Sequence, residues 1–395
     1  MKRVYMDHAA ATRLLPEVRE AMLPYLADVF GNPSSLHDWG DPAREAVENA
    51  REQVARLIGV EEPEEIIFTA SGSESNNLAI KGLAQAQQNK GKHIVISAIE
   101  HFSVLYSARA MEKAGFEISL VPVDKYGMVN PEDVRKAIRK DTVLISVMHA
   151  NGEVGTIQPI KEISEIAKEN RIVFHTDAVA TCGNFPVNVK ELGVDALSLA
   201  GNQFYGPKGS GALWVRRGVR LIPLIDGGIQ EGGWRAGTED VPAIVGLGKA
   251  AEIALKDLNS RMQKLIPLRD KLLKELPEKV GHVVVTGHPQ KRLPGHASFC
   301  VEFIEGESML MLLNSQGVGV SSGSSCTSRA LKASHVLLAM GLSHEVAQGS
   351  ILFTLGVGNQ TEDIDYILEI MPPIVKRLRE MSPLYAKYVK AGKGE

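Results

Sequence analysis

Short runs rich in β-branched residues alternate with amphipathic helical stretches in the first half of the chain, and this alternation constrains the fold more than any other feature. Helical patterns at 74–87 and 160–170 lie between several of the strand-like runs. The runs cover residues 65–70, 93–98, 117–124, 142–150, 171–178, 195–200 and 211–217. Such alternation is typical of βαβ units, so we expect an α/β fold with a mainly parallel sheet.

The second half of the chain is organised differently. A long helical stretch at 241–276 contains Pro267, and two strand-like runs at 282–287 and 296–303 follow it. A Gly/Ser-rich loop then leads to a last helix at 364–381, which contains a Pro-Pro pair that we expect to break it. We therefore predict a large α/β domain at 15–260 and a smaller α+β domain made of 1–14 and 261–395.

Composition limits the classes of partner and the cellular compartment that we expect for this chain. The 395 residues carry a formal net charge of -3, too little to favour nucleic acid or an anionic membrane as the main partner. The basic start of the chain has no apolar stretch behind it, and no apolar run approaches the length that spans a bilayer, so we expect no membrane partner and a cytoplasmic location. Three cysteines, an odd number in a long chain, indicate reduced thiols.

The first candidate site is a turn of small residues between a strand-like run and a helix. The backbone N–H groups of Gly72 and Ser73 would point outward at the helix N-terminus, where the helix dipole favours a phosphate group. The alternative is a simple capping turn, with Ser71 or Ser73 as the cap and Glu74 or Ser75 behind it. The stretch alone leaves both interpretations open.

Two further residues follow strand-like runs. Asp177 lies at the C-terminal end of a buried run, where open α/β sheets bind ligands, and its carboxylate could pair with a protonated ring nitrogen or cap the next helix. His101 could stack on a flat ring or be purely structural. Taken singly, neither residue decides between a functional and a structural role.

The three cysteines differ in their surroundings. Cys326 lies in a run of Ser and Gly that cannot pack as a core, so we expect an exposed thiol on a mobile loop, with Arg329 as a candidate cation to favour the thiolate. An incidental thiol is the alternative. Cys182 and Cys300 have apolar or strand-like neighbours, so we expect both to be buried and inert.

Ten segments, taken in order, resemble those of one protein family. They are YMDHAAAT, FGNPSSLH, ASGSESNNLAIKG, EHFSV, HANGEVG, HTDAV, YGPKG, RAGTED, SSGSSCTS and IDYILEI. Over nearly its whole length the chain resembles the cysteine desulfurases, the NifS/IscS-like group of the class V aminotransferase superfamily. The resemblance implies the type I fold of pyridoxal-phosphate-dependent transferases and a homodimer. It also implies a mobile cysteine that passes sulfur to a scaffold protein of iron-sulfur cluster assembly.

The resemblance also assigns residues to the cofactor. On the family's motifs, pyridoxal phosphate would contact Gly72, Ser73, His101, Asp177 and Thr238. The sulfur-accepting cysteine of the family corresponds to Cys326.

The motif that carries the covalent anchor of the cofactor departs from the family. Family members read Ser-Gly-His-Lys before the aromatic residue and YGPKG, and the resemblance implies that this lysine holds pyridoxal phosphate as a Schiff base. Here the four positions are Ala200, Gly201, Asn202 and Gln203. The nitrogen of a carboxamide has given its lone pair to the carbonyl, so Gln203 cannot form that bond. Lys208 is no substitute, because the family carries it beside the anchoring lysine.

Other polar contacts of the family's pocket are also missing. Gly152 replaces an asparagine and Ala180 a glutamine, both of which the resemblance assigns to the cofactor ring. Leu352 replaces the arginine that would clamp the substrate carboxylate, and Val357 replaces a second arginine. Each lost charge-assisted hydrogen bond costs roughly 1.5 to 3 kcal/mol. We therefore expect pyridoxal phosphate to be absent or weakly held.

Together these features predict a desulfurase-like protein of iron-sulfur cluster assembly that has lost pyridoxal-phosphate catalysis. Cys326 would carry sulfur from another source, or ligate a 2Fe-2S cluster shared with a U-type scaffold protein, since thiolate is a preferred ligand of such centres. The alternative is an active desulfurase that converts L-cysteine to L-alanine and an enzyme persulfide, with the cofactor held non-covalently or through another amine.

Overall fold

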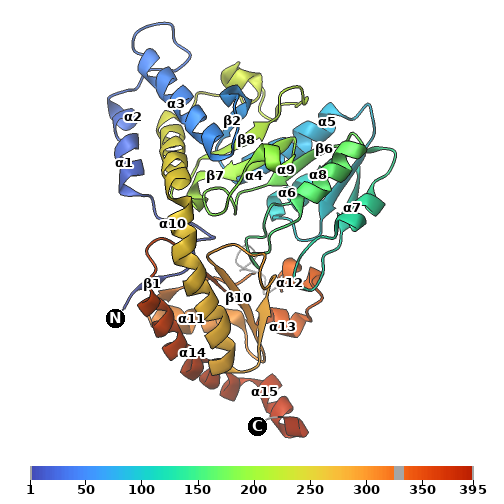
Figure 1. Cartoon of the computed structure of the whole chain (residues 1–395), viewed down its shortest axis with the longest axis vertical. Coiled ribbons are helices and arrows are strands. Elements are labelled where there is room, and N and C mark those ends of the chain that lie inside the picture. Colours follow the sequence, from blue (N-terminus) through green and yellow to red (C-terminus); the bar gives the residue numbers. More distant parts are fainter. Residues whose placement is uncertain (1, 324–332, 394–395) are drawn as a thin grey trace.

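The computed structural model describes residues 2–323 and 333–393. Figure 1 shows a large sheet in the upper part of the molecule, a smaller sheet below it, and the long helix α10 (Val241–Val280) running beside both. Within the described residues, seven strands form the large sheet in the order β2-β8-β7-β6-β5-β3-β4. The neighbours from β7 to β4 pair in parallel, whereas β8 is antiparallel to both β7 and β2.

All seven strand-like runs of the sequence are strands of this sheet. Their bounds are β2 (Ile66–Thr69), β3 (His93–Ser97), β4 (Glu117–Val121), β5 (Thr142–Ser146), β6 (Val173–Asp177), β7 (Ala196–Ala200) and β8 (Gly211–Val215). The prediction of an α/β fold with a mainly parallel sheet is confirmed.

Helices cover both faces of the large sheet, because alternate residues of each strand point to opposite sides. Ile66 and Phe68 of β2 belong to one buried cluster with residues of α3, α8 and the first half of α10, whereas Ile67 belongs to another with residues of α6 and of the helical run that begins at α4 and ends at α5. These helices are α3 (Asp41–Leu57), α4 (Gly72–Asn77), α5 (Leu83–Ala86), α6 (Phe102–Glu112) and α8 (Ile160–Glu169), with a π-helical turn (Leu78–Gly82) joining α4 to α5. The shorter helices of this part are α1 (Pro16–Met22), α2 (Pro24–Ala27), α7 (Pro131–Ala137) and α9 (Val189–Leu192).

The smaller sheet has the order β12-β10-β9 and is antiparallel. Its strands are β9 (Val283–Thr286), β10 (His296–Val301) and β12 (Ser350–Thr354), and the second half of α10 packs on it together with α11 (Gly306–Ser315) and α14 (Thr361–Met381). The remaining helices are α12 (His335–Ala339), α13 (His344–Gln348) and α15 (Pro383–Tyr388). Near the start of the chain, β1 (Val4–Tyr5) pairs in parallel with β11 (Val318–Gly319), which joins the N-terminal segment to this part.

One expectation for the second half is wrong, and one strand was not predicted. The Pro-Pro pair does not break the last helix, because α14 runs without interruption through Pro372 and Pro373. Leu368, Met371 and Val375 are buried along its length, and this packing holds the helix together despite the missing N–H donors. The strand that the sequence reading did not identify is β12.

The long helix is confirmed and extends to Val280, with Pro267 and Pro277 inside it. The predicted boundary between residues 260 and 261 falls within this helix, and the division into domains stays a prediction. None of the described helices has the length and apolar character needed to cross a bilayer.

Candidate functional site

A cavity of about 580 Å³ opens at the carboxyl ends of the parallel strands. Residues that follow β3, β5 and β7 line it, together with the last residue of β6. The start of α4, the N-terminal segment, residues 321–323, β12 and the first residues of α6 and α12 also contribute to the wall. The cavity thus lies where open α/β sheets bind ligands.

The cavity brings together most of the residues that the sequence singled out. The predicted residues that line it are Gly72, Ser73, His101, Gly152, Asp177, Ala180, Asn202, Gln203 and Leu352. Thr238 does not line it and lies instead on a separate cavity of about 180 Å³ that also contains Thr69 and Asp240. Cys326 and Arg329 lie outside the described residues.

The turn before α4 is a capping turn, as one of the two interpretations predicted. The hydroxyl of Ser71 accepts a hydrogen bond of 3.1 Å from the backbone N–H of Glu74, and the Glu74 carboxylate accepts one of 2.9 Å from the N–H of Ala70. A Cβ atom at Gly72 would lie 2.7 Å from Cγ2 of Val179, so only glycine lets the helix start pack this closely. The cap and a phosphate cradle are compatible, because Gly72 and Ser73 also line the cavity.

Asp177 is buried at the end of β6 and is held by two donors. Its Oδ2 accepts a hydrogen bond of 2.6 Å from Nδ2 of Asn76, and its Oδ1 accepts one of 2.9 Å from the N–H of Val179. Burial raises the pKa of Asp177, while these two hydrogen bonds and the nearby His101 oppose the rise. The sequence reading missed Asn76, although its place one helical turn after Gly72 was a usable signal.

His101 has a structural role as well as a place on the cavity wall. Its Nδ1 accepts a hydrogen bond of 3.1 Å from the N–H of Ser103 and so caps the start of α6. Because Nδ1 is an acceptor there, a neutral His101 ring carries its proton on Nε2.

The amide of Gln203 is tied to the N-terminal segment. Its Nε2 donates a hydrogen bond of 2.8 Å to the carbonyl oxygen of Ala9, and the side chain of Asn184 donates one of 3.1 Å to the backbone carbonyl of Gln203. The backbone carbonyl of Asn202 accepts from both the N–H and the hydroxyl of Thr12, at 3.0 and 2.9 Å. The loop that would carry a covalent anchor is thus held rigidly, with a carboxamide at the anchoring position.

The sequence reading also missed three carboxyl groups on the cavity wall, those of Asp7, Glu100 and Glu153. Burial raises the pKa of Glu100 to about 8 and that of Glu153 to about 7, and it also raises the pKa of Asp7. Oε1 of Glu100 accepts from the Ser97 hydroxyl at 2.6 Å and from the N–H of Met148 at 2.8 Å. Glu100 directly precedes His101 at the end of a strand, so the signal that marked His101 could have marked Glu100.

Leu352 is buried on β12 and lines the cavity where the resemblance places an arginine. Among the described residues that line the cavity there is neither lysine nor arginine. Lys208 is exposed and does not line it. The described residues therefore fit non-covalent contacts to a phosphorylated ring but not a covalent bond to its aldehyde.

The other two cysteines are buried, as predicted. Burial raises the pKa of Cys300 to about 12 and also raises that of Cys182. Both thiols therefore stay protonated at neutral pH and react slowly. Among the described residues, no group of three His, Cys, Asp or Glu side chains is placed to hold a metal ion.

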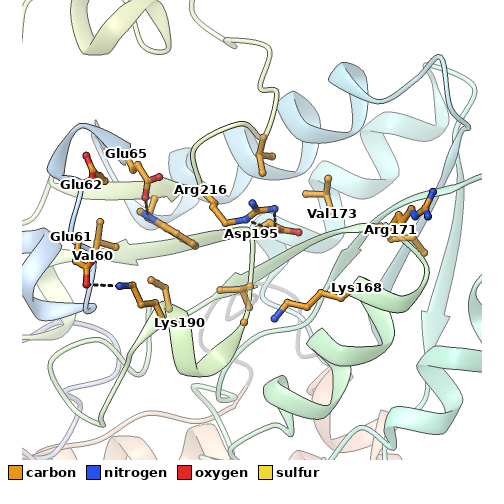
Figure 2. Close-up of a pocket in the computed structure, with 16 residues that line it drawn as sticks. Val60, Glu61, Glu62, Glu65, Lys168, Arg171, Val173, Lys190, Asp195 and Arg216 are labelled. Atoms are coloured by element: carbon orange, nitrogen blue, oxygen red, sulfur yellow. Dashed lines mark hydrogen bonds and ion pairs between the residues drawn. The ribbon is translucent and has the colours of Figure 1, made fainter.

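A second large cavity, of about 670 Å³, lies at the opposite ends of the strands. Figure 2 shows the carboxylates of Glu61, Glu62 and Glu65 at one end of it and Arg171 at the other. An ion pair of 2.5 Å joins Lys190 to Glu61. The pair is exposed and contributes little to stability, and none of the predicted site residues lines this cavity.

Comparison with known sequences identifies the class of protein that this fold and this cavity define. A family model described as aminotransferase class-V matches residues 4–367, so the chain belongs to that family.

Within the family, the chain is similar to proteins named cysteine desulfurase IscS. It is 52% identical over 386 residues to the one from Methanosarcina thermophila, covering 98% of this chain and 95% of the relative. It is also 52% identical over 384 residues to the one from Dictyoglomus turgidum, covering 97% of each chain. A solved structure titled NifS-like protein superposes with a TM-score of 0.89 at 37% identity, covering 95% of this chain and 100% of that chain. The expected family and the type I fold are thus confirmed.

Proposed function

We propose that this chain works in sulfur transfer for iron-sulfur cluster assembly without pyridoxal-phosphate catalysis of its own. The observation that carries the proposal is the carboxamide of Gln203, whose Nε2 is bound to the carbonyl of Ala9 at the position where the family's lysine would react. The absence of lysine and arginine among the described residues lining the cavity supports the same view. The similarity to proteins named cysteine desulfurase IscS supports a role in iron-sulfur assembly.

Sulfur handling would then depend on Cys326, which lies outside the described residues. The thiol would carry sulfur from another donor, or ligate a 2Fe-2S cluster together with a U-type scaffold protein. Cys182 and Cys300 are poor substitutes, because both thiols are buried and burial raises the pKa of each. We further propose a cytoplasmic homodimer, on the resemblance to the family.

The test compares Cys326→Ala with Cys300→Ala as a matched cysteine control. The purified protein is first treated with a persulfide donor, and mass spectrometry measures persulfide on the chain. A U-type scaffold, ferrous iron and an electron donor are then added, because persulfide sulfur must be reduced to become the sulfide of a cluster, and iron and sulfide analysis measures cluster content. We expect Cys326→Ala to lose the persulfide and to lower cluster content, and Cys300→Ala to retain both. Unchanged cluster content and complex formation in Cys326→Ala would refute the proposal.

A second candidate is an active cysteine desulfurase that holds its cofactor non-covalently. The gathering of Gly72, Ser73, His101 and Asp177 on one cavity favours this candidate, because the resemblance assigns all four to the cofactor. An absorbance spectrum of the purified protein, with and without added pyridoxal phosphate, separates the two. Saturable cofactor binding together with sulfide release from L-cysteine would favour the desulfurase over the sulfur carrier.

A further inference from the structure

The cavity contains an excess of acidic groups. Four carboxyl side chains line it, those of Asp7, Glu100, Glu153 and Asp177, and the described lining residues include no lysine or arginine. Two histidines also line it, but burial lowers the pKa of His335. Burial raises the pKa of all four carboxyls, to about 8 for Glu100 and about 7 for Glu153, so not all of them are ionised at neutral pH. A ligand that brings a positive charge stabilises their ionised form, because charges in a poorly solvated cavity interact strongly.

The orientation of the Gln203 amide specifies what it can recognise. A backbone carbonyl can only accept a hydrogen bond, so the group that faces the oxygen of Ala9 at 2.8 Å must be Nε2. The remaining polar atom, Oε1, has no hydrogen-bond partner among the described residues. An amide oxygen repels the oxygen of an aldehyde, whereas it accepts a hydrogen bond from an ammonium group. The replacement of the lysine therefore turns this position from a donor into an acceptor.

Another part of the cavity wall suits an anion. Gly72 and Ser73 begin a helical run that continues through α4, the π-turn and α5 to residue 86, and both residues line the cavity. The described residues offer no cluster of three ligands for a metal ion. An organic ligand, in contrast, can place a phosphate near this helix start and an amine near Gln203.

We propose that the cavity selects, at Gln203, a phosphorylated ligand that carries a protonated primary amine, and that it discriminates against the corresponding aldehyde. The proposal rests on the proposed function only in assuming that the cofactor is not covalently attached. Pyridoxamine 5′-phosphate is the direct probe, because it differs from pyridoxal 5′-phosphate only in having the amine in place of the aldehyde.

The first experiment uses the full-length chain after removal of any bound ligand. Equilibrium dialysis measures the affinity for pyridoxamine 5′-phosphate and for pyridoxal 5′-phosphate under identical conditions. We expect the amine form to bind at least about tenfold more tightly, the effect of one charge-assisted hydrogen bond. Equal affinities, tighter binding of the aldehyde, or no binding of either form would overturn the proposal.

The second experiment changes the polarity of position 203. Gln203→Met removes the acceptor at similar length, and we expect it to reduce the preference, leaving only the part that the carboxyl groups of the wall supply. Gln203→Lys restores an amine, and we expect it to weaken binding of the amine form and to trap the aldehyde form covalently, detected by mass spectrometry after borohydride reduction. Gln290→Met, an exposed glutamine that does not line the cavity, is the matched control and should retain the preference.

Circular dichroism and the thermal midpoint confirm that each variant is folded, and the comparison of the two ligands on the unmodified chain stands even if a variant does not fold. An undiminished preference in Gln203→Met, or no covalent adduct in folded Gln203→Lys, would also overturn the proposal. These failures are distinct from a failure of the Cys326→Ala test, which would refute the sulfur role and leave the ligand preference in place.

Discussion

The buried carboxyl of Glu100 predicts a pH dependence of stability that one substitution should remove. Burial raises the pKa of Glu100 to about 8, from an ordinary value near 4.5 that applies to the unfolded chain. Between these two pKa values, the Glu100 carboxyl is therefore protonated in the folded state and ionised in the unfolded state. The contribution of Glu100 is most favourable below the unfolded pKa, and it falls as pH rises through the interval between the two values.

The size of the effect follows from the two pKa values. One proton of difference corresponds to about 1.4 kcal/mol per pH unit, so Glu100 should lower the free energy of unfolding by roughly 3 to 4 kcal/mol between about pH 5 and about pH 8. Glu100→Gln keeps an oxygen that can accept from Ser97 and Met148, and it cannot ionise. The variant should therefore lose stability less steeply than the unmodified chain as pH rises.

Urea unfolding followed by tryptophan fluorescence at several pH values measures this difference directly. Glu112→Gln, an exposed carboxyl on α6, is the matched control and should leave the pH profile unchanged. Other buried groups, such as Glu153, titrate in the same interval but contribute equally to both proteins. Parallel pH profiles for Glu100→Gln and the unmodified chain would refute the reasoning.

Two further substitutions test how the buried polar groups are held. Asn76→Ala removes the donor that lies 2.6 Å from the buried carboxylate of Asp177, and it should lower the free energy of unfolding by about 1 to 3 kcal/mol. A change smaller than the error of urea unfolding would contradict the assigned hydrogen bond. Arg51→Met leaves Glu231 buried without its bidentate partner at 2.8 and 2.9 Å, so we expect a loss of about 3 to 5 kcal/mol that adding Glu231→Leu largely reverses. A double variant no more stable than Arg51→Met would argue against an uncompensated charge as the cause.

The edge strand β4 is partly exposed, but the other six strands of the large sheet are buried on both faces, and this makes the sheet recognisable in the sequence. Such strands read as continuous apolar runs bounded by turns, and all seven were recognisable. The strand β12 carries a similar buried pattern, but it was missed. The Pro-Pro pair of α14 misled the reading because local propensity predicts a break where tertiary packing maintains the helix.

The candidate site was only partly visible for a related reason. Asp177 and His101 follow strands, so their convergence could be predicted from topology. The carboxyl of Asp7 could not, because it reaches the cavity on an N-terminal segment that is held through Thr12 and Gln203, contacts that join residues nearly two hundred positions apart. The orientation of the Gln203 amide, on which the ligand preference depends, likewise follows from the carbonyl of Ala9 and not from the residue type.

The helix α10 contributes to two hydrophobic cores along its length. Val241 to Ala254 pack with the large sheet, and Leu265 to Leu276 pack with the small one. Unfolding of either core would remove the tertiary packing of about half of the helix, and a helix without packing is only marginally stable in water. Heat should therefore disrupt both halves in a single cooperative transition, and a protease cut within α10 should loosen the two together.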